Sequence, residues 1–219
     1  VLFYFENLWL NVLGILLLMW ANFYDSADGQ LARMTGKKTR WGRILDGFAG
    51  DVWFFCIYAA ICLRLQDDCI PFTEISWGIW IWLLCAFAGF VCHGKQCQLA
   101  DYYRNIHLYF IKGEAGSELD NSRKLSEEFA SLNWKHDGAW KLFLFFYRNY
   151  TSNQESMTHD FQSFKQKIDQ RFGRVLPAAL IDEFRTGSLP LLPYANILTF
   201  NTRAIVLYVS LLVGHPWIY

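Results

Sequence analysis

Long uncharged apolar runs limit what this chain of 219 residues can fold into. Residues 8–24, 75–94 and 204–219 contain no Asp, Glu, Lys or Arg. Each run approaches the roughly 20 residues that a helix needs to cross the hydrocarbon core of a bilayer. Apolar residues make up 53% of the chain and aromatic residues 18%. The sequence therefore predicts an all-α, polytopic transmembrane helical bundle.

A fourth apolar run, residues 52–63, is too short to span a membrane by itself. It reaches the required length only if its helix begins near Ile44 and includes Asp46 and Asp51. Acidic residues inside membrane helices normally face the interior of a bundle or a water-filled cavity, and they mark functional sites. We therefore expect these two carboxylates to belong to such a site.

Charged residues between the apolar runs indicate an orientation in the membrane. Residues 33–43 carry five basic residues and no acidic residue, whereas residues 64–74 carry three acidic residues and one Arg. Because basic loops stay on the cytoplasmic side, we expect the first loop, and the acidic residues beside it, at the cytoplasmic face. The formal net charge of zero provides no global basic field, so no nucleic-acid partner is expected.

We expect three parts along the chain. Residues 1–112 form a transmembrane catalytic core, residues 113–185 a cytosolic helical insertion, and residues 186–219 a return to the membrane. Residues 96–112 are amphipathic and either extend the third membrane helix into the cytosol or lie at the interface. The chain starts with Val and stops inside an apolar run, so we expect a piece of a longer protein whose last helix is truncated.

Residues 25–51 combine carboxylates, glycines and an arginine at fixed spacings. Asp25 and Asp28 are three residues apart and share a helix face, as do Gly42 and Asp46 at the start of the next helix. Gly29 allows a ligand to approach the backbone closely. Carboxylates are ligands for Mg²⁺, and Arg33 offers a planar cation suited to phosphate. These are the components that phosphoryl transfer requires.

The pattern Asp-x2-Asp-Gly-x2-Ala-Arg-x8-Gly-x3-Asp resembles the signature of the CDP-alcohol phosphotransferase family at every one of these positions. The matching residues are Asp25, Asp28, Gly29, Ala32, Arg33, Gly42 and Asp46. The resemblance implies a membrane bundle of about six helices in the full protein, of which roughly four lie in this chain. It also implies transfer of a substituted phosphate from a CDP-alcohol to a hydroxyl acceptor in phospholipid synthesis, with release of CMP.

The family resemblance assigns expected roles to the motif residues. Asp25, Asp28 and Asp46 would bind Mg²⁺ or Mn²⁺ in a two-metal site, and Asp51 would be a further ligand and the general base. The expected nucleotide contacts are Gly29, Ala32, Arg33 and Gly42. Membrane lipids and one or both substrates would be partners, and a homodimer is one expected assembly.

One position departs from the family pattern. The fourth Asp of the signature falls at position 50, where this chain has Gly50, and the carboxylate follows at Asp51. One additional residue of an α-helix turns a side chain by about 100°, away from the face of Asp46. A π-bulge would turn Asp51 back toward that face, and the neighbouring glycines make such a distortion less costly. We therefore predict a bulge between Asp46 and Asp51; otherwise the base is missing or differently supported.

Several alternatives remain open from the sequence. The chain is alternatively a catalytically silent relative, or an ion-coupled transporter that uses its buried carboxylates. If the chain is a transferase, the lipid is carried either by the donor or by the acceptor. Polar residues near the third and last spans either line an acceptor or phosphate pocket or form solvated and interfacial surface. They are His93, Lys95, Asp101, Arg104, His107, Asn201 and Arg203.

Overall fold

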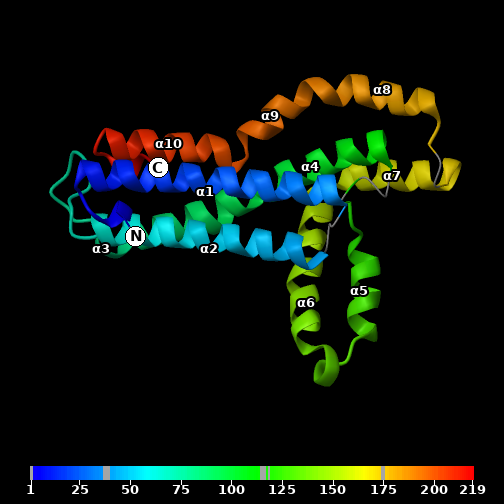
Figure 1. Ribbon diagram of the computed structural model, residues 1–219, viewed down its shortest axis with the longest axis horizontal. Helices are drawn as coiled ribbons and strands as arrows, with labels where there is room; N and C mark the ends of the chain where they lie inside the picture. Colours follow the sequence, from blue (N-terminus) through cyan, green and yellow to red (C-terminus); the bar gives the residue numbers. More distant parts are fainter. Residues whose placement is uncertain (1, 37–39, 114–116, 118, 174–175) are drawn as a thin grey trace. The chain divides into compact units, whose positions relative to one another are not determined.

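The computed structural model describes residues 2–36, 40–113, 117, 119–173 and 176–219, and every element of regular structure in them is a helix (Figure 1). The chain divides into two compact units. The bundle unit comprises residues 1–94 and 200–219, and the second unit comprises residues 95–199. The expected all-α architecture is confirmed.

The first long helix, α1 (Leu8–Thr35), contains the whole first half of the motif. The Asn7 side chain caps its start by accepting hydrogen bonds from the backbone N–H groups of Trp9 and Leu10, and Gly36 ends it with a left-handed φ of 66°. The sequence predicts a loop over residues 33–43. The helix instead continues to Thr35, because Gln, Leu, Ala, Arg and Met are good helix formers.

The second helix, α2 (Arg40–Leu65), is α-helical throughout. Its start before Ile44 confirms that Asp46 and Asp51 lie within the helix of the fourth apolar run. The predicted π-bulge between these two residues is wrong, because the regular α-helix continues through Gly47 and Gly50 without a change of hydrogen-bonding pattern. Glycine permitted a distortion at this point but did not require one.

A π-helix occurs on the third run instead. The helices α3 (Gly78–Ala86), η2 (Phe87–His93, the π-helix) and α4 (Gly94–Lys112) follow one another without a gap. Residues 96–112 therefore extend the third helix, which was one of the two alternatives left open by the sequence. In η2 the Gly94 N–H donates to the Gly89 carbonyl, five residues back.

The last apolar run forms α10 (Phe200–Leu212), which ends before the final residues of the chain. Gly214 adopts a left-handed φ of 75°, and Pro216 starts the short 3₁₀ helix η5 (Pro216–Ile218). Both residues are unfavourable inside an α-helix, so the run does not continue as one helix to Tyr219.

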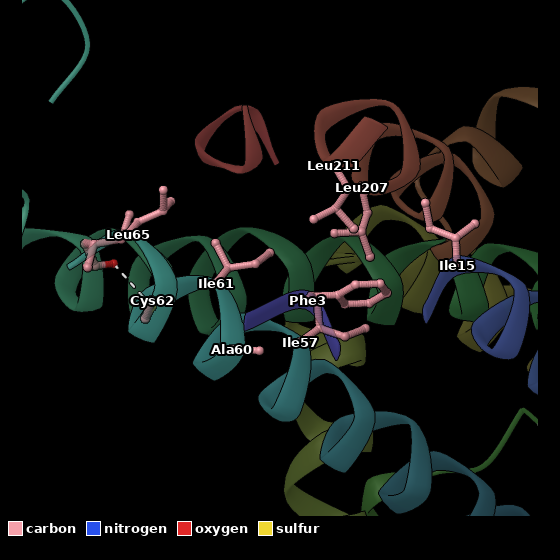
Figure 2. Close-up of a cluster of buried hydrophobic side chains, with 10 residues drawn as sticks. Phe3, Ile15, Ile57, Ala60, Ile61, Cys62, Leu65, Leu207 and Leu211 are labelled. Carbon is pink, nitrogen blue, oxygen red and sulfur yellow. Dashed lines mark hydrogen bonds between the residues drawn. The ribbon is translucent and has the colours of Figure 1, made fainter. Parts of the chain in front are cut away.

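Aliphatic side chains from α2 and α10 form the core of the bundle unit around Phe3 (Figure 2). Phe3 belongs to the short helix η1 (Leu2–Tyr4) and is 6% exposed. It packs against α1 at Gly14, where an added Cβ would lie 2.6 Å from the Phe3 ring. Gly14 is therefore required for η1 to contact α1. The remaining core members shown in the figure include Ile57, Ile61, Leu65, Leu207 and Leu211.

The second unit consists of α4 after Gly94 and a series of shorter helices. These are α5 (Ser122–Ser131), α6 (Trp134–Ser156), α7 (His159–Phe172), α8 (Ala178–Ser188), η4 (Leu189–Leu191) and α9 (Leu192–Ile197). Its core includes Phe110, which is 1% exposed and stacks on Phe184 with ring centroids 3.8 Å apart. The segment expected to be a helical insertion thus contains α5, α6, α7 and most of α8. A cytosolic position for it stays a prediction.

Within the described residues, four helical segments are long and apolar enough to cross a membrane: Leu8–Ala32, Leu45–Leu65, Gly78–Lys112 and Ala178–Leu212. Only 11% to 28% of the most apolar window in each segment is buried inside the structure. Apolar side chains that no protein surface covers are suited to contact with lipid chains. The chain is an integral membrane protein.

Candidate active site

The first half of the motif occupies one face of α1. Asp25, Asp28, Gly29 and Ala32 follow the spacing i, i+3, i+4, i+7, which aligns side chains along a helix. Gly29 and Ala32 are partly buried, whereas the two carboxylates are exposed. Because Gly29 and Ala32 carry little or no side chain, the surface beside the carboxylates is open to a ligand.

The structure brings the second half of the motif to this face through Asp46. The Asp46 carboxyl makes a hydrogen-bonding contact with the Asp25 carboxyl and interacts electrostatically with Asp28. Two carboxyl groups in contact repel each other when both are ionised, and a cation bound between them would remove this repulsion. Three of the four predicted acidic residues are therefore neighbours, although Asp25 and Asp46 are 21 positions apart in the sequence.

The donor chemistry of this cluster fits a hard divalent cation, because every candidate ligand is a carboxylate oxygen. As placed, however, no group of three or more His, Cys, Asp or Glu side chains within the described residues encloses a metal position. The contact between Asp25 and Asp46 is the observation that favours a cation at this point. Binding of Mg²⁺ or Mn²⁺ stays a prediction.

The other expected nucleotide contacts are only partly described. Gly42 lies in the first turn of α2, one helical turn before Asp46, and is exposed. The backbone of Arg33 is helical and continues the face of α1, but its side chain lies outside the described part of the structure. The roles expected for Gly29, Ala32, Arg33 and Gly42 stay predictions.

Within the described part of the structure, the Asp51 carboxyl makes no contact with the other three carboxylates. In a regular α-helix it shares a face of α2 with Phe54 and Tyr58, at i+3 and i+7. The rings of Phe54 and Tyr58 lie against His93 of η2, with centroids 3.9 Å and 6.4 Å apart. Asp46 meets α1, whereas Asp51 is exposed and lies on the helix face that also carries Phe54 and Tyr58.

Sequence reasoning did not connect Asp51 with these aromatic residues. The only available signal was the spacing of Asp51, Phe54 and Tyr58, which indicates a common helix face but not which helix covers it. His93 was considered as a pocket residue, and Arg203 as a phosphate ligand. Their mutual proximity, through an electrostatic interaction between α10 and η2, became visible only in the structure.

Fold and site together define a polytopic helical membrane protein with a carboxylate cluster between its first two long helices. The family model described as CDP-alcohol phosphatidyltransferase matches residues 1–106, just under half of the 219-residue chain, and supports assignment of the chain to this family. The match supports a membrane transferase role in phospholipid synthesis, and this family generally depends on a divalent metal. No curated protein and no solved structure matches the chain.

Proposed function

We propose that the protein transfers a substituted phosphate from a CDP-alcohol to a hydroxyl acceptor and releases CMP. The observation that carries this proposal is the contact between Asp25 of α1 and Asp46 of α2, with Asp28 beside it, inside a motif that matches the family signature at seven positions. The match of residues 1–106 to the family model also supports it. A transporter would use buried carboxylates but would not require Gly29, Ala32 and Arg33 at their fixed spacing.

The reaction balances as a substitution at phosphorus. The acceptor oxygen forms a bond to the phosphorus that carries the alcohol of the donor, and the bond from this phosphorus to the bridging oxygen of CMP breaks. The bridging oxygen leaves as part of CMP, and the proton of the acceptor hydroxyl passes to a base. Asp51 is the carboxylate of the motif that does not contact another acidic residue of the cluster, so we assign it as this base.

The three neighbouring carboxylates, Asp25, Asp28 and Asp46, would hold Mg²⁺ or Mn²⁺. A bound divalent ion would neutralise the pyrophosphate charge and stabilise the leaving phosphate oxygen. In this assignment Asp25 and Asp46 lose their mutual repulsion when the cation binds. Gly29, Ala32 and Gly42 leave room for the cytidine nucleotide, and Arg33 supplies a positive charge near it. We expect this site to face the cytoplasm.

The test is release of CMP by the full chain in lipid nanodiscs, with Mg²⁺, Mn²⁺ or a chelator, across lipid-linked and water-soluble CDP-alcohols. We expect metal-dependent release from at least one donor and acceptor pair. The variant Asp46→Asn should lose at least 100-fold in activity, which is about the low end of the loss when one electrostatic contact to the transition state is removed. Absence of CMP release with every pair would favour a catalytically silent relative, and ion uptake without CMP release would favour the transporter.

A further inference from the structure

Two cysteines from neighbouring helices contact each other in the bundle unit. Cys62 lies on the last turn of α2, and Cys85 lies near the end of α3. Their side chains form a hydrogen-bonding contact with each other. The Cys62 thiol also donates a hydrogen bond to the carbonyl oxygen of Ile81, which is 3.7 Å away and one helical turn before Cys85 (Figure 2). Both contacts place the Cys62 sulfur against the turn of α3 that carries Cys85.

Backbone hydrogen bonds hold the end of α2 beside the start of α3. The backbone N–H of Trp77 donates to the carbonyl oxygen of Asp68 at 2.9 Å, and that of Gly78 donates to the carbonyl oxygen of Gln66 at 2.8 Å. The two helices are therefore joined by these bonds as well as by the chain. Because their backbones are already held together, the two sulfurs can approach to the disulfide bond length of about 2.05 Å chiefly by rotation of side chains.

The two thiols differ in burial, which determines the order in which they can react. Cys62 is 1% exposed and belongs to the aliphatic core of the bundle unit, whereas Cys85 is half-buried beside that core. An oxidant from outside the protein can therefore reach Cys85 before Cys62. A single cysteine in a membrane helix would be explained as a small apolar residue. The contact between the two sulfurs is what that explanation does not require.

The pair lies near one end of its helices. Cys62 is three residues before the end of α2 at Leu65, which corresponds to about 4.5 Å along the helix axis. We expect residues 33–43 at the cytoplasmic face, so α2 runs from that face to the opposite side of the membrane. Disulfides form and persist outside the cytoplasm, where the environment is oxidising. The expected orientation therefore places both cysteines close to a compartment that favours their oxidation.

We propose that Cys62 and Cys85 are a disulfide-forming pair, and that their oxidation by a disulfide oxidant links α2 to α3. The Cys85 thiolate attacks the oxidant, which forms a mixed disulfide and releases one thiol. The Cys62 thiolate then attacks the Cys85 sulfur and releases the second thiol. The two protons and two electrons that the cysteines lose end on the two thiols of the reduced oxidant. The link fastens together two membrane helices and does not rest on the proposed function.

The experiment treats the reduced full chain in lipid nanodiscs with oxidised glutathione. Remaining thiols are blocked with N-ethylmaleimide, and the digested protein is analysed by mass spectrometry without reduction. We expect a cross-linked species that joins the peptides of Cys62 and Cys85, lighter by two hydrogen atoms than the two reduced peptides together. Dithiothreitol should convert it back to the separate peptides.

Thermal unfolding provides a second measurement. The disulfide would close a loop across 23 positions of the sequence, which restricts the unfolded chain. We expect the oxidised protein to unfold about 5 °C above the reduced protein. Cys62→Ser and Cys85→Ser should each abolish both the link and this difference. Cys56→Ser, at an exposed position of the same helix α2, is the matched control and should retain both.

Three outcomes would overturn the inference. One is a mixed disulfide of glutathione with the exposed Cys69, which shows that the oxidant is active, without a link between Cys62 and Cys85. The others are a link from either cysteine of the pair to a different cysteine, and a thermal midpoint that falls when the pair is linked. Because neither measurement uses CMP release, each outcome leaves the proposed function untouched.

Discussion

Moving the carboxylate of Asp51 back by one position tests whether the register of α2 determines activity. The double variant Gly50→Asp, Asp51→Gly places the carboxylate at the position that the family signature uses. An added Cβ at Gly50 meets no atom within 4 Å, so the new side chain fits without displacing a neighbour. Because the two substitutions exchange the same two residue types within one helix, their effects on helix propensity nearly cancel.

The expected loss follows from helix geometry. A helix with its side chains is about 10–12 Å wide, so a rotation of 100° moves a carboxylate about 8 Å around the axis. A general base must lie within about 2.6–3.2 Å of the proton that it removes, so this displacement takes it out of reach. General-base catalysis contributes about 10²- to 10⁴-fold, equivalent to about 3–5 kcal/mol. We expect the double variant to lose activity in this range, and we expect the same of Asp51→Asn.

The measurement is the rate of CMP release at saturating donor, acceptor and metal concentrations. Gly47→Ala is the matched control, because its new methyl group on the same helix also meets no atom within 4 Å. It should keep nearly full activity. If the double variant is as active as the wild type or more active, the carboxylate acts from position 50. The regular helix would then not describe the working state of α2.

Three further predictions concern stability and the metal site. Gly14→Leu should destabilise the bundle unit by about 1–3 kcal/mol through overpacking, because its Cβ would lie 2.6 Å from the Phe3 ring. The control Gly187→Ala, whose added Cβ meets no atom within 4 Å, should leave the thermal midpoint nearly unchanged. Asp46→Asn should abolish CMP release, yet it should raise the thermal midpoint measured in chelator, because it removes one of two carboxylates in contact. An unchanged or lower midpoint would contradict that contact. Glu155→Gln should increase amide hydrogen exchange at the start of α5, because the Glu155 carboxylate accepts hydrogen bonds from the backbone N–H and the hydroxyl of Ser122. These hydrogen bonds are together worth about 1.5–3 kcal/mol, and unaltered exchange there would argue against this link.

The prediction of a π-bulge shows where reasoning from residues alone failed. Gly47 and Gly50 lower the cost of a distortion in α2, and the family spacing favoured one there. The structure has a regular helix at that point and a π-helix at Phe87–His93, on the third apolar run. Local sequence indicates where a distortion is tolerated. Which helix adopts it depends on the packing of neighbouring helices.

The sequence predicted the membrane character, the helical fold and the metal-site candidates, because these depend on the lengths of apolar runs and on spacings within single helices. Those spacings placed Asp25 and Asp28 on one face and started α2 before Asp46. Only the tertiary structure decided which residues of different helices meet. It joined Asp25 to Asp46 across 21 positions, and it brought Arg203 to His93 across 110. Lipid chains are as apolar as these helices, so hydrophobicity does not itself specify which helix faces which partner; close packing and polar contacts between the helices do.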